Sequence, residues 1–93
     1  MDRVIEHIKE IGLKYKVDKI VLFGSRARGD HSSVSDYDIA VFERALSTLD
    51  KAHFCDELDE IETLKKIDTV FVHDKDTDEL MKSIMRDGVI VYE

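Results

Sequence analysis

The sequence predicts a single domain of the α/β or α+β class, in which helices pack on a small mixed sheet of about four strands. Three observations lead to this fold class. Stretches with helical periodicity alternate with short apolar, β-branched runs, in the order αβ(α)βαβαβ. The chain has 93 residues, 43% of them hydrophobic, which suits one compact core. No internal repeat or linker interrupts residues 1–93, so we expect one domain over this range.

Three amphipathic stretches predict the longer helices. They cover residues 3–15, residues 47–65 and the segment around Leu80–Met85, where Gly88 is a suitable residue to follow the helix end. The apolar positions that define the first two stripes are Val4, Ile5, Ile8, Ile11, Phe54, Leu58, Ile61 and Leu64.

Four short runs predict strands, at residues 19–23, 36–42, 67–73 and 89–92. The first run is followed by Gly and Ser, which favour a turn and the start of a short helix over residues 26–28. We therefore expect a strand-to-helix corner directly after the first strand.

The overall charge limits the classes of partner. Fourteen basic against 21 acidic residues give a net charge of −7, which argues against broad capture of a nucleic acid backbone. A nucleotide remains possible because metal ions can screen a small acidic site. The apolar runs are too short to span a membrane, and the N-terminal residues lack a signal-peptide pattern, so we expect a cytoplasmic protein without a membrane partner. Cys55 is the only cysteine, which leaves no intrachain disulfide.

Three carboxylates stand at positions that indicate chemistry. Asp36 and Asp38 are two residues apart on one predicted strand, so their side chains point the same way, roughly 6–7 Å apart along the strand. Their mutual repulsion is relieved if a cation lies between them. Asp68 enters another apolar strand, which is costly unless the acid is paired, metal-bound or at an exposed strand end. The alternative is that Asp36 and Asp38 are solvated acids at a strand start and that Asp68 is a structural acid.

The turn at Gly24 and Ser25 has the features of a phosphate site. Free backbone N–H groups and the helix dipole at a strand-to-helix junction favour an anion, and glycine allows its close approach. Arg26 and Arg28 can add positive charge there, or can be solvated side chains of a short helix. A phosphate-binding corner and a carboxylate pair joined by one loop are the parts that phosphoryl or nucleotidyl transfer needs.

The spacing between the glycine turn and the acid pair resembles the signature of a known family. Gly24-Ser25, ten residues and Asp36-Tyr37-Asp38 resemble the GS-x10-D-x-D signature of the nucleotidyltransferase superfamily, which includes DNA polymerase beta and kanamycin nucleotidyltransferase. The longer run GSRARGDHSSVSDYDIAVF resembles the minimal, MntA-like nucleotidyltransferases more closely still, with Ile39 in place of the usual Leu. Asp68 is the only good match to the family's third carboxylate.

The resemblance implies a role for each of these residues. Asp36, Asp38 and Asp68 would be the catalytic and metal-binding set, with two Mg²⁺ ions expected. Asp68 would also orient or deprotonate the acceptor hydroxyl. Gly24 and Ser25 would hold the β- and γ-phosphates of ATP or another nucleoside triphosphate, so that pyrophosphate leaves in line.

The resemblance also suggests the acceptor. Minimal nucleotidyltransferases of this kind are commonly paired with a small, all-helical HEPN toxin and can place AMP on one of its tyrosines, so we expect an antitoxin with protein adenylyltransferase activity. Two alternatives stay open: a non-catalytic antitoxin that neutralises its partner by occlusion, and a small-molecule nucleotidyltransferase active as a homodimer. The carboxylate set favours catalysis, because a pure binder has no need of clustered, mutually repelling acids.

Overall fold

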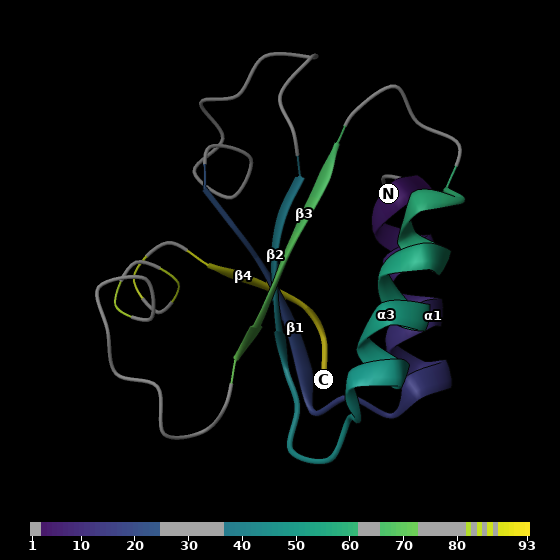
Figure 1. The fold of residues 1–93 in the computed structure, drawn as a ribbon. Coiled ribbons are helices and arrows are strands. Elements are labelled where there is room, and N and C mark those ends of the chain that lie inside the picture. The colour runs from purple at the N-terminus through teal and green to yellow at the C-terminus, as the bar shows by residue number, and fades with distance from the viewer. Residues whose placement is uncertain are drawn as a thin grey trace.

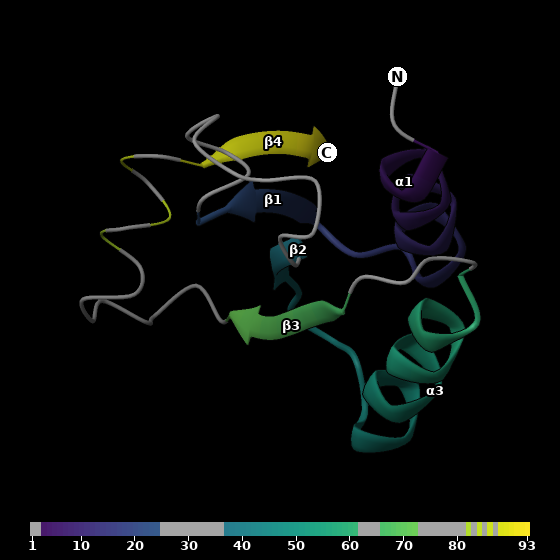
Figure 2. The same cartoon turned by 90° about the horizontal axis from the view of Figure 1, so that it is seen from above.

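The computed structural model describes residues 3–24, 37–61 and 66–72, the single residues 82, 84 and 86, and residues 88–93. Helices cover one face of a mixed sheet, which confirms the predicted α+β class (Figures 1 and 2). The elements in this part of the chain are α1 (Arg3–Tyr15), β1 (Lys19–Phe23), β2 (Tyr37–Phe42), α3 (Thr48–Asp59), β3 (Ile67–Val72) and β4 (Val89–Tyr92).

The sheet has the strand order β3-β2-β1-β4. Strand β1 pairs antiparallel with both β2 and β4, whereas β2 pairs parallel with β3. Helices α1 and α3 lie side by side on the same face of this sheet in both views (Figures 1 and 2). Strand β2 therefore has a neighbour on each side and a helical layer over one face.

The predicted strands agree closely with the observed ones. The first and last, residues 19–23 and 89–92, have the predicted bounds, and the other two differ by one residue at an end. Asp36 and His73, the residues at those two ends, lie outside the described residues, as does the short helix expected over residues 26–28. In the region of the last predicted helix, Lys82, Ile84 and Arg86 are helical, and the Gly88 N–H donates to the Ile84 carbonyl at 2.8 Å.

Helix α3 is shorter than predicted. The sequence pattern indicated a helix over residues 47–65, but α3 ends at Asp59, with Glu60 as its C-cap. Its start is well defined, since Ser47 is the N-cap and forms a reciprocal capping box with Asp50. Its last turn contains no basic residue, and the acidic side chains there are repelled by the negative end of the helix dipole. The apolar periodicity continues to Ile61, which is buried although it lies beyond the helix, and Leu64 is outside the described residues.

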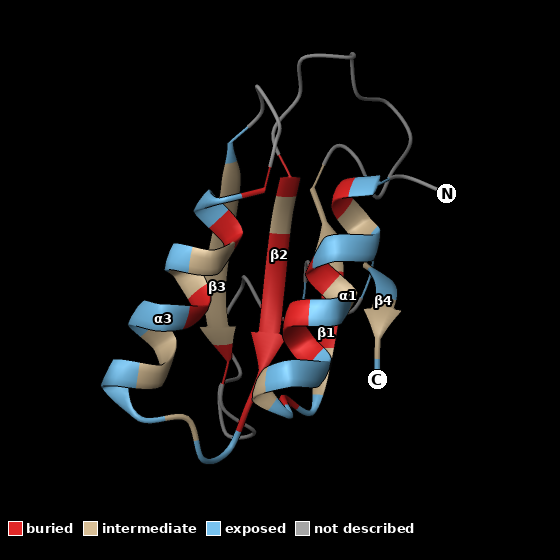
Figure 3. Ribbon diagram, turned by 90° about the vertical axis from the view of Figure 1, so that its right-hand side faces the viewer, coloured by how far each residue is buried: buried red, intermediate tan, exposed pale blue. Residues whose placement is uncertain are grey.

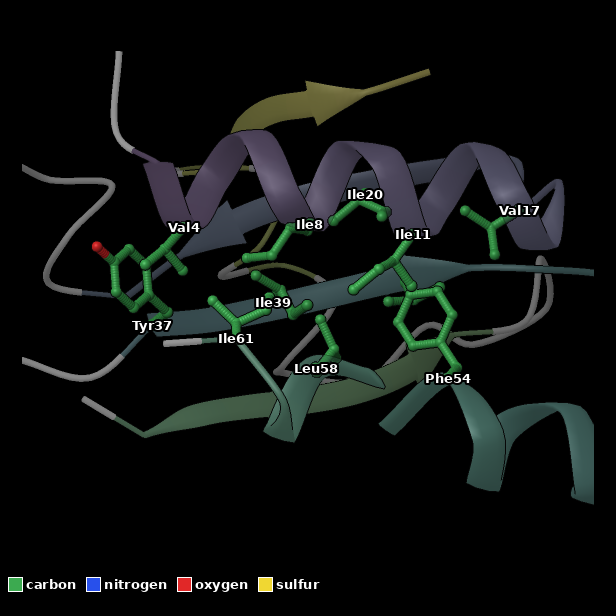
Figure 4. Close-up of a cluster of buried hydrophobic side chains, with 11 residues drawn as sticks. Val4, Ile8, Ile11, Val17, Ile20, Tyr37, Ile39, Phe54, Leu58 and Ile61 are labelled. Atoms are coloured by element: carbon green, nitrogen blue, oxygen red, sulfur yellow. The ribbon is translucent and has the colours of Figure 1, made fainter. Parts of the chain in front are cut away.

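The main core lies between the helices and the sheet. Figure 4 shows side chains from α1 and from the α3 region pointing toward those of β1 and β2, and Figure 3 shows that buried residues line the sides of the helices that face the sheet. Ile8, Ile39 and Phe54 are each completely buried in this layer. The buried members of this cluster are Val4, Ile8, Ile11, Val17, Ile20, Tyr37, Ile39, Val41, Phe54, Leu58 and Ile61.

The opposite face of the sheet carries a smaller apolar cluster. Its buried members are Val21, Ala40, Phe42, Val72 and Ile84, with Phe23 and Val70 partly buried against them. Successive residues of a strand point to opposite faces. The odd-numbered residues of β2 therefore belong to the helix-covered face, and its even-numbered residues belong to the other.

Polar and aromatic contacts join α1 to α3 and α3 to β3. The Tyr15 hydroxyl donates a hydrogen bond to Glu57, and Lys14 Nζ lies 2.9 Å from the other oxygen of that carboxylate. The Phe54 ring contacts Tyr15 and Phe71 edge to face, at centroid distances of 5.5 and 5.8 Å. Phe54 is thus the central contact that ties both helices to the edge strand β3.

None of the helices in the described ranges combines the length and the apolar character needed to span a membrane.

Candidate functional site

The strand register brings two of the predicted acids together. Asp38 is the second residue of β2 and Asp68 the second residue of β3, and the parallel pairing places them directly opposite one another. On the other side of β2, Asp38 is paired with Phe23, the last residue of β1. The row Phe23–Asp38–Asp68 therefore crosses three strands at the end of the sheet where β1 ends and where β2 and β3 begin.

Both carboxylates belong to the face that α1 and α3 leave uncovered. Asp38 has the same parity along β2 as Ala40 and Phe42, which are in the smaller cluster, and Asp68 has the same parity along β3 as Val70. Asp38 is half-buried and the Asp68 side chain is 44% exposed. The two acids are thus close to each other and remain open to a ligand from solvent.

Gly24 approaches the Asp38 carboxylate closely. Its φ of 75° lies in the left-handed region, which disfavours residues with a Cβ. A Cβ built on Gly24 would also stand only 2.5 Å from Asp38 Oδ2. The positive φ favours glycine here, and a Cβ would also displace the end of the Asp38 side chain, so the chain turns out of β1 with its backbone against the acid.

Lys66 is a cation that the sequence reasoning did not single out. Its Nζ lies 3.4 Å from Asp68 Oδ1, and its carbonyl accepts the Tyr37 N–H at 2.9 Å. The backbone of Lys66 is therefore tied to the start of β2, next to Asp38. The signal in the sequence was its i, i+2 spacing from Asp68, which on an extended segment puts both side chains on one face.

The remaining predicted site residues lie outside the part of the chain that the structure describes. They are Ser25, Arg26, Arg28 and Asp36. Among the described residues, no three side chains of the His, Cys, Asp or Glu type come together as a metal site. The described residues thus supply a pair of acids, and the third acid of the predicted set, Asp36, immediately precedes β2.

The arrangement suits a hard divalent cation. Mg²⁺ prefers oxygen ligands and is commonly bound by one or two carboxylates together with substrate phosphates. Asp38 and Asp68 supply such oxygens on one face of neighbouring strands. Position 24 has no side chain, and any Cβ there would occupy space against Asp38 Oδ2. The donor set and the close backbone approach therefore fit a metal–phosphate ligand.

Other features of the described residues lie away from this pair. A groove of about 350 Å³ runs between α1 and α3 and includes Glu10 and Glu57 in its lining, and another of about 470 Å³ includes Asp18 and Arg44. Cys55 is half-buried on α3, and burial raises the pKa of its thiol, which disfavours a thiolate nucleophile. The acid pair is thus the strongest candidate site among the described residues.

Comparison with known proteins assigns the class. Residues 6–93 match the family described as polymerase beta, nucleotidyltransferase. The chain belongs to this nucleotidyltransferase family.

Two curated relatives are candidate protein adenylyltransferases of Methanocaldococcus jannaschii. The first, MJ0141, is 42% identical over 52 residues, which cover 50% of this chain and 52% of the relative. The second, MJ1215, is 50% identical over 36 residues, which cover 39% of this chain and 42% of the relative. The matched region thus spans about half the length of these relatives.

Solved structures share the fold. A toxin–antitoxin complex with AMP-PNP contains a chain that matches 94% of this one over 71% of its own length, with a TM-score of 0.73 and 22% identity. A complex of a tri-AMPylated HEPN toxin of Shewanella oneidensis with its MNT antitoxin gives a TM-score of 0.68, 20% identity and coverage of 95% and 68%. A candidate nucleotidyltransferase from Sulfolobus solfataricus gives a TM-score of 0.57, 23% identity and coverage of 95% and 78%.

Proposed function

We propose that this chain is a Mg²⁺-dependent nucleotidyltransferase that moves AMP from ATP to a tyrosine hydroxyl of a helical HEPN-type partner, and so acts as a cytoplasmic antitoxin. The observation that carries this proposal is the register pairing of Asp38 with Asp68, beside the close backbone approach of Gly24. A pair of acids next to a glycine turn is the combination that nucleotidyl transfer needs.

The residues have distinct roles in the proposed reaction. Asp36, Asp38 and Asp68 would hold two Mg²⁺ ions, which would supply Lewis-acid stabilisation of the phosphate charge. Gly24 and Ser25 hold the β- and γ-phosphates, and Arg26 and Arg28 add positive charge. These contacts orient the triphosphate so that pyrophosphate faces away from the acceptor.

The bond changes involve the α-phosphorus of ATP. The acceptor oxygen forms a bond to this phosphorus, and the bond from the phosphorus to the bridging oxygen of pyrophosphate breaks. The acceptor proton moves to Asp68, whose partly exposed carboxylate lies at the open end of the row. Transfer leaves AMP esterified to the acceptor and releases pyrophosphate.

The relatives support the choice of acceptor. Two of them carry the name of candidate protein adenylyltransferases, and one solved complex with a chain of the same fold holds a tri-AMPylated HEPN toxin together with its MNT antitoxin. A HEPN-type helical protein is therefore the partner we propose, with its tyrosine as the acceptor.

The test is co-expression of the Asp68→Asn variant with the proposed HEPN-type partner. Asparagine keeps the size of the side chain but cannot accept the proton, so transfer should fall by ~10²-fold or more while the complex still forms. Growth of the cells and the intact mass of the toxin measure protection and AMP transfer separately. Asp59→Asn is the control, since Asp59 is exposed at the end of α3.

Each rival function predicts a different result. Full protection by Asp68→Asn with an unmodified toxin would establish an occluding antitoxin instead of an enzyme. Transfer to a small hydroxyl compound by a purified homodimer, with the toxin unmodified by the wild type, would establish a small-molecule nucleotidyltransferase.

A further inference from the structure

Lys66 is the cation that lies beside the acid pair in the described structure. Its backbone is fixed, because its carbonyl accepts the Tyr37 N–H, whereas its side chain is 74% exposed. Nζ lies 3.4 Å from Asp68 Oδ1. Lys66 is therefore anchored at the open end of the acid row, with a long side chain that can change partner without moving the strand.

The Lys66–Asp68 contact is too loose and too exposed to be a structural requirement. Ion pairs between exposed side chains contribute little to stability and are screened by salt. The contact therefore costs little to break when another ligand reaches Asp68. Its importance lies in the charge that it adds to the site.

The sign of that charge affects two ligands in opposite ways. A free divalent cation approaching Asp38 and Asp68 is repelled by Lys66, which already neutralises part of the negative charge. A metal–triphosphate complex carries net negative charge, so the same ammonium group attracts it. One cation thus penalises the metal alone and favours the metal that arrives with a nucleotide.

We propose that Lys66 makes this site select the metal–triphosphate complex over the free divalent ion. This inference rests on the proposed function. Lys66 is the counter-ion of Asp68 in the nucleotide-free protein, and it turns toward the phosphate charge when the complex binds. It is a positioning and specificity residue, and it takes no proton in the reaction.

The test measures the binding of two probes to the full chain by calorimetry: MnCl₂ alone, and a non-cleavable α,β-methylene ATP saturated with Mg²⁺. For Lys66→Gln we expect binding of Mn²⁺ to become roughly threefold tighter and binding of the nucleotide complex roughly threefold weaker, from the loss of one exposed charge near the ligand. Both changes should shrink in high salt, because the interaction is screened. Lys66→Arg should restore both affinities.

A matched control removes another lysine from an exposed ion pair. Lys14 pairs with Glu57 at 2.9 Å in the helical layer, which covers the other face of the sheet, so Lys14→Gln changes the net charge equally and should leave both affinities unchanged.

The outcomes separate the two proposals. If the wild type binds both probes and Lys66→Gln shifts both affinities in one direction, or shifts neither, the role of Lys66 is wrong while the proposed function stands. If the wild type binds neither probe, the proposed nucleotidyl transfer fails, and this inference fails with it.

Discussion

The two faces of the sheet are used for different purposes, and strand β2 serves both. Its odd-numbered residues Tyr37, Ile39 and Val41 are buried under α1 and α3, where the core is apolar. Its even-numbered residues begin with Asp38 and continue with Ala40 and Phe42 into the smaller cluster. Tyr37 is thus buried in the apolar core, whereas its neighbour Asp38 is half-buried on the opposite face of the sheet.

This difference separates the clustered acids from most of the buried apolar surface. Repulsion between Asp38 and Asp68 acts on the face where both are partly exposed, while the buried area that stabilises the fold lies mostly on the other face. Variants on the helix-covered face should therefore change folding, and variants at the acid row should change chemistry.

The largest effect is expected for Phe54→Ala. Phe54 is fully buried and contacts both Tyr15 and Phe71, so its loss should lower the free energy of unfolding by about 3–5 kcal/mol. Urea denaturation measures the change. Leu49→Ala on the same helix removes a side chain from a residue that is 64% exposed, and should change stability by no more than about 0.5 kcal/mol. Equal losses for the two variants would mean that α3 is not packed as described.

The second largest effect is expected for Asp38→Asn, which should impair metal binding and AMP transfer without unfolding the protein. Even a residue that merely supports a metal ligand typically costs 10–100-fold in affinity or activity when changed, so loss of a direct ligand should lower AMP transfer by ~10²-fold or more. The melting temperature without nucleotide should stay close to that of the wild type, since repulsion with Asp68 is removed. The rise in melting temperature caused by Mg²⁺ and ATP should disappear.

Asp18→Asn is the matched control for this variant. Asp18 lies before β1, at the opposite end of the sheet, where it forms an exposed ion pair with Arg44 at 2.9 Å. A loss of transfer in Asp18→Asn equal to that in Asp38→Asn would contradict the assignment of the site.

Gly24→Ala should change both the stability of the protein and its AMP transfer. The left-handed φ alone costs about 1–2 kcal/mol for a residue with a Cβ, and the new methyl group would also press on Asp38 Oδ2. We expect modest destabilisation together with a loss of transfer larger than the unfolded fraction explains. Gly12→Ala places its Cβ 2.7 Å from Ile20 Cδ1, on the helix-covered face, and should alter stability without altering the transfer rate of the folded protein.

Tyr15→Phe should have the smallest effect, and that effect should depend on pH. The hydrogen bond to Glu57 raises the pKa of Tyr15 to about 12 and lowers the pKa of Glu57. The Tyr15 contribution to stability is present below pH 10 and is lost as the pH rises toward 12. The Glu57 contribution is present above its ordinary value of 4.5 and is lost as the pH falls through its lowered value. Melting curves of wild type and variant should therefore differ most between these limits, and a constant difference at all pH values would exclude the linkage.

The strands and α1 could be predicted because each carries a strong local pattern. The end of α3 could not, because Ile61 continues the apolar period while the acids of the last turn and the Glu60 cap end the helix. The pairing of Asp38 with Asp68 likewise depends on strand order and register, which bring together residues 30 positions apart. The sequence indicated both acids through their unusual contexts, whereas the i, i+2 spacing of Lys66 and Asp68 is too common a pattern to single out their contact.

Strand β3 lies at the edge of the sheet, and this position has a consequence for local opening of the protein. The separation of Asp38 from Asp68 is set by the β2–β3 ladder, and in the strand order β3 pairs with β2 alone. Edge strands open with a smaller free energy than the whole protein needs to unfold. Amide hydrogens of β3 should therefore exchange faster than those of β1, and bound metal and nucleotide, by bridging the two strands, should slow that exchange. Whether Asp38 and Asp68 lie together then depends on how often β3 opens from the sheet, as well as on the charges of the two side chains.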